Sequence, residues 1–321
     1  MARSAEIRRR LRYTSNLLWR SAVTPMGGTH RQPRLVSPDQ LGVTFIGHSS
    51  FLVQAAGRNL LFDPVFTNWL ILLRRQRRPG VQIPDLPPID LVLLSHAHMD
   101  HLNRPSLRRI VRATRRKTGR APIAIVPKDV ADVLQGLGFS RVIELNWWEH
   151  TTIAGLTITH TPARHWGTRW FMDGHRGYGG FVVEGGAQRL YYSGDTAYFR
   201  GFAEIGVRLR PDIALLPIGA YSPDSFRNVH TSPEDALRAF QDLGAGRMIP
   251  MHYGTFWLSQ EPMDEPLPRL LQSADRLGLA HRILPLEEGE TAVLTRDGAA
   301  HQLRGHRDNN GLSGTDLTMA R

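Results

Sequence analysis

The sequence contains no cysteine among its 321 residues. Disulfide bonds and thiolate metal sites are therefore both excluded. A metal ion in this protein has to be held by histidine, aspartate or glutamate side chains, which form the harder set of ligands. The redox compartment stays undetermined, because a chain without thiols suits either side of a membrane.

A long apolar segment is also absent. No window holds 18 consecutive apolar residues, so no transmembrane helix is predicted. The first 20 residues carry scattered arginines and lack an uninterrupted apolar stretch with a cleavage site, which argues against a secretory signal. We therefore expect a cytoplasmic protein, or a peripheral one on the inner membrane surface.

Acidic residues are in deficit. The chain has 29 Asp and Glu against 40 Lys and Arg, a formal net charge of +11 at pH 7. Such a surplus favours anionic partners, namely nucleic acid, anionic lipid or a phosphorylated small molecule. An arginine-rich surface without any such partner explains the charge equally well.

The apolar pattern predicts short strands first and then strands alternating with helices, twice over. Helices are expected over 105–116, over 129–134 and from Ser232, where Ser-Pro-Glu-Asp supplies an N-cap and a proline in the first turn. The order predicts an α/β fold with two mixed sheets packed together and helices outside. The predicted strands are 43–46, 51–53, 59–62, 91–94, 123–126, 142–145, 156–159, 180–183, 189–192, 213–216 and 247–249.

One main domain is expected over residues 39–296, with an extension at each end. The tail over 297–321 holds Gly, Asn, Ser and Asp without periodicity, so we predict that it is disordered. The extension over 1–38 contains a basic amphipathic pattern, which suits either a membrane surface or packing on its own domain. Its apolar stripe comprises Ile7, Leu11 and Leu18, and its opposite face comprises Arg9, Arg12 and Arg20.

The densest group of metal-ligand side chains is the segment Ser95-His96-Ala97-His98-Met99-Asp100-His101. It directly follows the predicted buried strand at 91–94. Residues two apart on extended backbone point to the same side, so the first two imidazoles can share a target while the last two ligands turn to a second point. The segment predicts two metals sharing a site. A chance cluster is disfavoured, because such polar groups are costly to desolvate together.

Four later segments offer the remaining ligands of a two-metal site. Three of them follow predicted strands, where ligands of layered α/β folds are usually found, and one precedes a helix. A lone histidine is more often structural, but together with residues 96–101 these side chains complete a ligand set. They are His165, Asp195, His230 and His252.

This pattern of His-x-His-x-Asp-His, a later His, Gly-Asp-Thr and a late His resembles the metallo-β-lactamase superfamily. Over about residues 40–290 it is most similar to the N-acyl-phosphatidylethanolamine phospholipase D branch, although ascorbate-phosphate lactonase-like members share much of the framework. The resemblance implies a four-layer αββα sandwich. The stretches that carry it are Phe45-Ile46-Gly47-His48-Ser49-Ser50, Phe62-Asp63-Pro64-Val65-Phe66, Leu86-Pro87-Pro88-Ile89-Asp90, Pro162-Ala163-Arg164-His165-Trp166, Ser193-Gly194-Asp195-Thr196-Ala197-Tyr198 and Met251-His252-Tyr253-Gly254-Thr255-Phe256.

The resemblance also implies how the ligands divide. One metal ion would be held by His96, His98 and His165. The other would be held by Asp100, His101 and His252, and Asp195 would bridge the two. Two zinc ions suit these ligands best, and iron or manganese also fit.

Two of these side chains are expected to be catalytic. A water bridging two metal ions loses a proton near neutral pH, and Asp100 would orient the resulting hydroxide. His230 would contact the substrate or a developing oxyanion. His48 and Asp63 are interpreted as support for the ligands, or else as strand-end packing. His150, His160 and His175 have no place in the motif.

An apolar run with a tryptophan stands immediately before four arginines, and this combination is typical of an interfacial membrane element. The alternatives are a core-packed helix with a charged end and a dimer contact, so a homo-oligomer stays open. The expected membrane-contact residues are Trp69, Leu70, Ile71, Leu72, Arg74, Arg75, Arg77 and Arg78.

The first functional hypothesis is a peripheral phosphodiesterase that converts N-acyl-phosphatidylethanolamine to phosphatidic acid and N-acylethanolamine. The second is a soluble hydrolase of phosphorylated small molecules, such as a sugar-phosphate lactone. A nuclease is a third hypothesis, but no dedicated RNA-binding insertion is visible, so nucleic acid is not the expected partner. A non-enzymatic metal-binding scaffold would require a complete ligand set to be idle.

Overall fold

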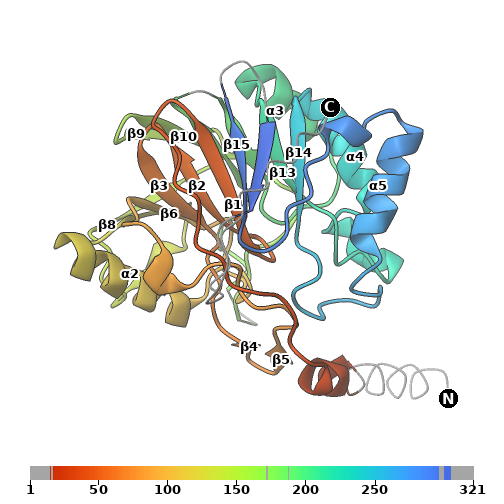
Figure 1. Ribbon diagram of the computed structural model, residues 1–321, viewed down its shortest axis with the longest axis horizontal. Coiled ribbons are helices and arrows are strands. Elements are labelled where there is room, and N and C mark those ends of the chain that lie inside the picture. The colour runs from red at the N-terminus through yellow and green to blue at the C-terminus, as the bar shows by residue number, and fades with distance from the viewer. Residues whose placement is uncertain (1–14, 16, 171–172, 187, 296–299, 305–321) are drawn as a thin grey trace, which may run out of the picture.

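The computed structural model describes residues 15, 17–170, 173–186, 188–295 and 300–304. Two sheets pack face to face, with helices on their outer sides (Figure 1). Within the described residues, no helix is long and apolar enough to cross a bilayer.

The first sheet has eight strands in the order β16-β15-β1-β2-β3-β6-β7-β8. Strands β3, β6, β7 and β8 run parallel, and the pairs on the other side are antiparallel. The bounds are β1 Leu41–Gly47, β2 Ser50–Ala55, β3 Arg58–Phe62, β6 Leu91–Leu93, β7 Ile123–Pro127, β8 Arg141–Leu145, β15 Glu290–Leu294 and β16 Ala300–Arg304.

The second sheet has six strands in the order β14-β13-β12-β11-β10-β9. Strands β12, β13 and β14 are parallel, and β9 to β12 form an antiparallel meander. The bounds are β9 His150–Ile153, β10 Leu156–Thr161, β11 Gly180–Glu184, β12 Leu190–Tyr192, β13 Ile213–Pro217 and β14 Arg247–Met251.

Three apolar cores hold the layers together. The central core lies between the sheets and includes Phe51, Phe62 and Phe181. The second core joins the first sheet to helix α2, Arg104–Thr118. The third joins the second sheet to α3 Gly201–Leu209, α4 Pro233–Leu243 and α5 Pro266–Arg276. The expected αββα sandwich is confirmed.

Most predicted elements are present, and the differences have local causes. Helix α4 begins at the predicted cap, where Ser232 and Asp235 form a reciprocal capping box. The helix predicted over 129–134 is wrong, since only the 3₁₀ turn Ala131–Leu134 forms there and Gly136 follows at φ 74°. Helices α3 and α5 and strands β9, β15 and β16 were not predicted. The other 3₁₀ turns are Ile83–Asp85, Asp224–Asn228 and Ala280–Arg282.

The two terminal extensions are partly built into the fold. The boundary placed at residue 297 is wrong, because β16 pairs with β15 as an edge strand; residues 305–321 lie outside the described residues. Residues 17–23 are helical, while Ile7 and Leu11 lie outside the described part. Further along, Arg31 forms an ion pair with Glu287, so the described extension packs against the domain.

The predicted membrane element is a small β-hairpin, formed by β4 Trp69–Leu70 and β5 Leu73–Arg74. Leu70 is buried beside Val65 and Phe256, so it cannot contact a membrane. Arg75 is fully buried, donates to the carbonyls of Val65 and Thr67, and is equally excluded. Arg75 is therefore a structural residue, because buried carbonyl groups need a hydrogen-bond donor where water is excluded.

The remaining residues of that prediction are at least partly accessible. Trp69, Ile71 and Leu72 are 49%, 69% and 62% exposed. Arg74 donates to the carbonyl of Ala22, Arg77 pairs with Glu288, and Arg78 is exposed. The apolar hairpin tip thus remains available for a partner.

We predict that Arg75→Ala lowers the free energy of unfolding by about 2–4 kcal/mol, because two buried carbonyls lose their donor and a cavity opens. Arg78→Ala is the matched control and should stay within about 0.5 kcal/mol of wild type, since its side chain is exposed. Urea unfolding measures both. Equal stability of the two variants would show that the buried guanidinium is dispensable.

Candidate metal centre

The ligand-type side chains converge from several strand ends. Residues 95–101 lie between β6 and α2, and His165, Asp195 and His252 follow β10, β12 and β14. His230 lies just before α4. The two sheets therefore bring together segments that are far apart in the sequence, and all seven predicted metal ligands lie in one cluster.

The first group of ligand atoms consists of three imidazole nitrogens. His98 Nδ1 lies 2.8 Å from His96 Nε2 and 3.3 Å from His165 Nε2. The other ring nitrogens have partners: His165 Nδ1 is 2.8 Å from the carbonyl of Val229, and His96 Nδ1 is 2.9 Å from Ser95 Oγ. These contacts fix the rings with three nitrogens facing a common point.

The second group surrounds two carboxylate oxygens. Asp195 Oδ2 lies 3.0 Å from His252 Nε2 and 3.3 Å from His101 Nε2. Asp100 Oδ2 lies 3.7 Å and 3.6 Å from the same two nitrogens. Asp195 Oδ2 is also 3.9 Å from His165 Nε2 in the first group. Asp195 is therefore the side chain that reaches both groups, as a bridging ligand must.

The spacing fits metal ions. Two ligand atoms at 2.0–2.1 Å from one tetrahedral ion lie about 3.3 Å apart, which matches the separations within both groups. His101 Nε2, His252 Nε2 and Asp195 Oδ1 are buried without a hydrogen-bond partner among the described residues. Buried polar atoms rarely stay unpaired in this way, so the donor set fits two divalent ions.

The two groups differ in their electrostatics: burial keeps imidazoles of the first group neutral, as metal ligands must be, whereas imidazoles of the second group lie beside two carboxylates. Burial, reinforced by neighbouring imidazoles, lowers the pKa of His96 well below its usual value, and burial likewise lowers the pKa of His165. Burial opposes the charge of His252, but Asp195 and Asp100 outweigh it and raise the pKa to about 9. The pKa of Asp195 lies well below its usual value despite burial, because His101 and His252 are close. The carboxylates are thus ionised at neutral pH.

Asp63 organises the second group from behind. Its Oδ2 lies 2.6 Å from His101 Nδ1 and accepts a hydrogen bond of 2.6 Å from Tyr192 OH. Its carboxylate also accepts from the amide and hydroxyl of Ser95. Second-shell carboxylates of this kind fix the tautomer and direction of a ligating imidazole. Sequence reasoning proposed Asp63 but missed Tyr192, whose strand position resembles ordinary core.

His48 supports the same group on the other side. Its Nε2 lies 3.0 Å from Asp100 Oδ2, and its ring packs 4.3 Å from that of His252. Both His48 and His252 have φ of 61°, and Asp63 has φ of 38°. Non-glycine residues in this region are strained, and such strain is concentrated at functional sites.

Glycine is required beside the bridging ligand. Gly194 has φ of 62°, and a Cβ there would come within 2.6 Å of Ser95 Cβ. The Gly-Asp-Thr motif thus has a steric reason, because its backbone packs directly on the 95–101 segment.

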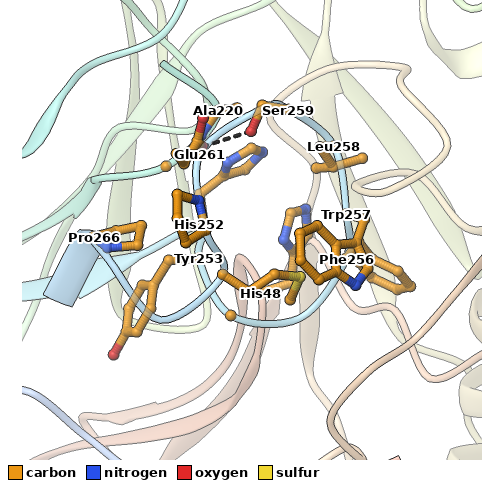
Figure 2. Close-up of a pocket in the computed structure, with 14 residues that line it drawn as sticks. His48, Ala220, His252, Tyr253, Phe256, Trp257, Leu258, Ser259, Glu261 and Pro266 are labelled. Atoms are coloured by element: carbon orange, nitrogen blue, oxygen red, sulfur yellow. Dashed lines mark hydrogen bonds between the residues drawn. The ribbon is translucent and has the colours of Figure 1, made fainter. Parts of the chain in front are cut away.

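The loop that carries His252 is held in place by a buried carboxylate (Figure 2). Glu261 accepts hydrogen bonds from the amides of Ala220 and Ser222 at 2.6 and 3.0 Å, and from the hydroxyl of Ser259. Figure 2 shows His252 and His48 within the curve of this loop. Sequence reasoning missed Glu261, because an isolated glutamate gives no pattern.

His230 lies at the rim of the cluster. Its Nδ1 is 3.7 Å from Asp195 Oδ2, and burial lowers its pKa to about 4. Trp166 lies alongside, with ring centroids 4.4 Å from His165 and 5.0 Å from His98, and is partly exposed. His150, His160 and His175 belong to none of the metal-ligand groups found among the described residues.

Comparisons with known proteins agree with this architecture. The family model of the beta-lactamase superfamily domain matches residues 58–253, which is more than half of the chain. The fold and the His/Asp site define a metal-dependent hydrolase. The chain belongs to the metallo-β-lactamase superfamily.

Individual relatives refine this picture. An uncharacterized protein of Mycobacterium tuberculosis is 35% identical over 247 residues, which cover 74% of this chain and 64% of that protein. The chain thus spans less than two thirds of this relative. N-acyl-phosphatidylethanolamine-hydrolyzing phospholipase D 1 of Caenorhabditis elegans is 32% identical, covering 74% and 71%. The solved metallo hydrolase Igni18 of Ignicoccus hospitalis is 28% identical with a TM-score of 0.61, covering 79% and 98%.

We predict that Asp63→Asn lowers metal affinity about 10–100-fold, because the amide cannot accept from all of its present donors and His101 loses its orientation. Asp275→Asn, an exposed position on α5, is the matched control and should bind metal like wild type. Chelator competition followed by metal analysis measures both affinities, and circular dichroism confirms folding. Unchanged affinity in folded Asp63→Asn protein would remove the orienting role.

Proposed function

We propose that this protein is a metal-dependent phosphodiesterase of the phospholipase D type, acting on N-acyl-phosphatidylethanolamine-like lipids. The observation that carries the proposal is the position of Asp195 Oδ2 between two groups of ligands, as a binuclear hydrolase requires. The similarity to the nematode phospholipase D supports the choice of substrate.

In this proposal, Asp100 and His230 have separate roles in the reaction. Metal ions held by this ligand set would supply Lewis acidity and lower the pKa of bound water. Burial alone would raise the pKa of Asp100, but His101 and the hydrogen-bond partners of Asp100 hold that pKa well below its usual value. Asp100 is therefore ionised, and in this proposal it accepts a hydrogen bond from the attacking water. Neutral His230 donates to the phosphoryl oxygen that gains charge.

The test is a hydrolysis screen of the metal-loaded protein on N-acyl-phosphatidylethanolamine, unmodified phospholipids, cyclic phosphodiesters and lactones. We expect N-acylethanolamine and phosphatidic acid as products by mass spectrometry. Asp195→Ala should abolish hydrolysis and reduce metal content, because both ligand groups lose a shared oxygen. His175→Ala, an exposed histidine outside the cluster, is the control and should keep full activity.

The same screen separates the alternative. Activity on a phosphorylated lactone without phospholipid turnover would favour a soluble hydrolase of phosphorylated small molecules. Full hydrolysis by metal-depleted Asp195→Ala would falsify the two-metal proposal for any substrate. Zinc is the proposed metal, and reconstitution with zinc, iron or manganese before the screen compares the three.

We also propose that the hairpin tip contacts the membrane where the lipid substrate resides. Ile71 stands in the two-residue loop between β4 and β5 with φ of 53°, where a β-branched side chain is disfavoured. Neither turn geometry nor burial explains an exposed Ile-Leu pair at this position. Insertion into the acyl-chain boundary of a bilayer would bury both side chains.

For this contact we predict that Ile71→Ser with Leu72→Ser weakens binding to neutral phosphatidylcholine vesicles about tenfold or more, because two apolar side chains no longer insert. Val207→Ser, an exposed apolar position on α3, is the control and should bind like wild type. Vesicle co-sedimentation measures the three proteins. If wild type and the double variant bind equally, the tip has no role in membrane contact.

A further inference from the structure

Helix α2 has a strongly basic outer face. Seven of its 15 residues are Arg or Lys, and none is acidic. At 3.6 residues per turn, five of the arginines fall within an arc of about 120°. These residues form the basic face: Arg108, Arg109, Arg112, Arg115 and Arg116. All five are exposed, while Leu107, Ile110 and Val111 anchor the opposite side in the core.

The basic face stands out because its charges have no counter-ions. Among the described residues, none of its five guanidinium groups forms an ion pair. Many other arginines do, for example Arg176 with Asp132, Arg189 with Glu184 and Arg269 with Glu234. Five positive charges therefore stand together on one face of a helix without an ion-pair partner among the described residues.

Only part of this arrangement stabilises the helix itself. Arg108, Arg112 and Arg116 are spaced four apart, and like charges at that spacing repel. Arg108 and Arg109 lie beyond the first turn, so the helix dipole does not favour them there. The side chain of Asn103 caps the first turn, and the amide of Gly119 donates to the backbone carbonyl of Arg115, so neither cap needs an arginine side chain. Arg115 and Arg116 suit the negative end of the helix dipole in the last turn, but the dipole does not account for Arg108, Arg109 and Arg112. These three charges are the part of the basic face that suggests an external anion.

The position of α2 relates it to the metal centre and the hairpin. The helix begins three residues after His101, and Ser106 Oγ accepts a hydrogen bond from the amide of Phe66, just before the hairpin. In Figure 1, α2 lies beside the lower left of the first sheet, and the β4–β5 hairpin lies below the sheets. The helix around Ser21 joins the hairpin, because Ser21 Oγ accepts from the amide of Arg74 and Gln76 Nε2 donates to the carbonyl of Ser21.

We propose that the basic face of α2 is an electrostatic docking surface for anionic phospholipid headgroups. Charge complementarity selects an anionic partner, and the exposed apolar tip of Trp69, Ile71 and Leu72 favours a bilayer over a nucleic acid. The basic face itself contains no aromatic side chain on which a base could stack. The proposal names the partner of the proposed lipid hydrolase, but it does not depend on which bond the site cleaves.

The test compares vesicle binding of the metal-loaded full chain at two compositions, phosphatidylcholine alone and with about 30 mol% phosphatidylglycerol. Each arginine at an anionic surface contributes about fivefold to the partition coefficient. Substituting Arg109, Arg112 and Arg116 together with Gln should therefore weaken binding to the anionic vesicles about 100-fold, and should leave binding to neutral vesicles unchanged. Raising the salt to about 0.5 M should weaken wild type similarly.

Two control variants separate charge from folding. Lys at the same three positions keeps the charge and should retain binding within a few fold. Gln at Arg208, Arg210 and Arg276 removes the same charge from exposed positions on or beside α3 and α5, and should bind like wild type. If this second control loses as much binding to anionic vesicles as the Gln variant of α2, the loss reflects net charge alone and the proposed docking surface is refuted.

Other outcomes also decide the proposal. Unchanged anionic-vesicle binding by the Gln variant would refute it. So would RNA binding at physiological salt by wild type, lost in the Gln variant, with no binding to anionic vesicles. Hydrolysis of detergent-dispersed lipid should be the same in wild type and the Gln variant, because the metal site is untouched. Absence of that hydrolysis in both proteins would refute the proposed substrate and leave the vesicle result standing.

Discussion

The structure depends on desolvating imidazoles and carboxylates around a common point. His96, His101, His252 and Asp195 are almost completely buried, and burial of such groups is unfavourable unless they are paired. In the second group the ring nitrogens and carboxylate oxygens are 3.0–3.7 Å apart, yet several of these atoms lack hydrogen bonds. Metal ions satisfy these atoms together, whereas hydrogen bonds between the ligands would satisfy only some. The surrounding fold therefore has to hold a geometry that serves a metal.

The two-sheet architecture holds the ligands in that geometry. Each ligand segment follows a short buried strand, so sheet hydrogen bonds fix the backbone to within four residues of the first ligand in each segment. The left-handed conformations of His48, Asp63 and His252 are strained, but the ladders beside them and contacts such as His252 N to His48 O at 2.9 Å maintain them. Tyr192 and Asp63 then connect the second sheet to the first directly beneath the metal centre.

The sequence predicted those elements whose formation depends on neighbouring residues in the chain. The buried run at 91–94 and the histidines after it predicted the central strand and its ligands, and the Ser232 N-cap with the proline after it predicted the start of α4. Contacts between residues far apart in the sequence could not be predicted. No pattern near Glu261 indicates that it supports a loop, and none near Tyr192 indicates that it donates to Asp63. The membrane contact predicted for Leu70 and Arg75 was wrong for the same reason. Both pack against Phe256, and Arg75 also donates to the carbonyls of Val65 and Thr67. A hydropathy pattern does not encode such contacts.

The two proposed membrane contacts act over different distances. Fields from the basic face extend about a Debye length, roughly 8 Å at physiological salt, so they act before contact. Insertion of Ile71 and Leu72 gains free energy only when water leaves their surfaces, so it acts after contact. A single weak anchor gives marginal, reversible binding, and stable attachment needs two signals. In the proposed arrangement, α2 draws the protein to an anionic surface and the hairpin fixes its orientation, while the segment between His96 and His101 leads directly into that helix.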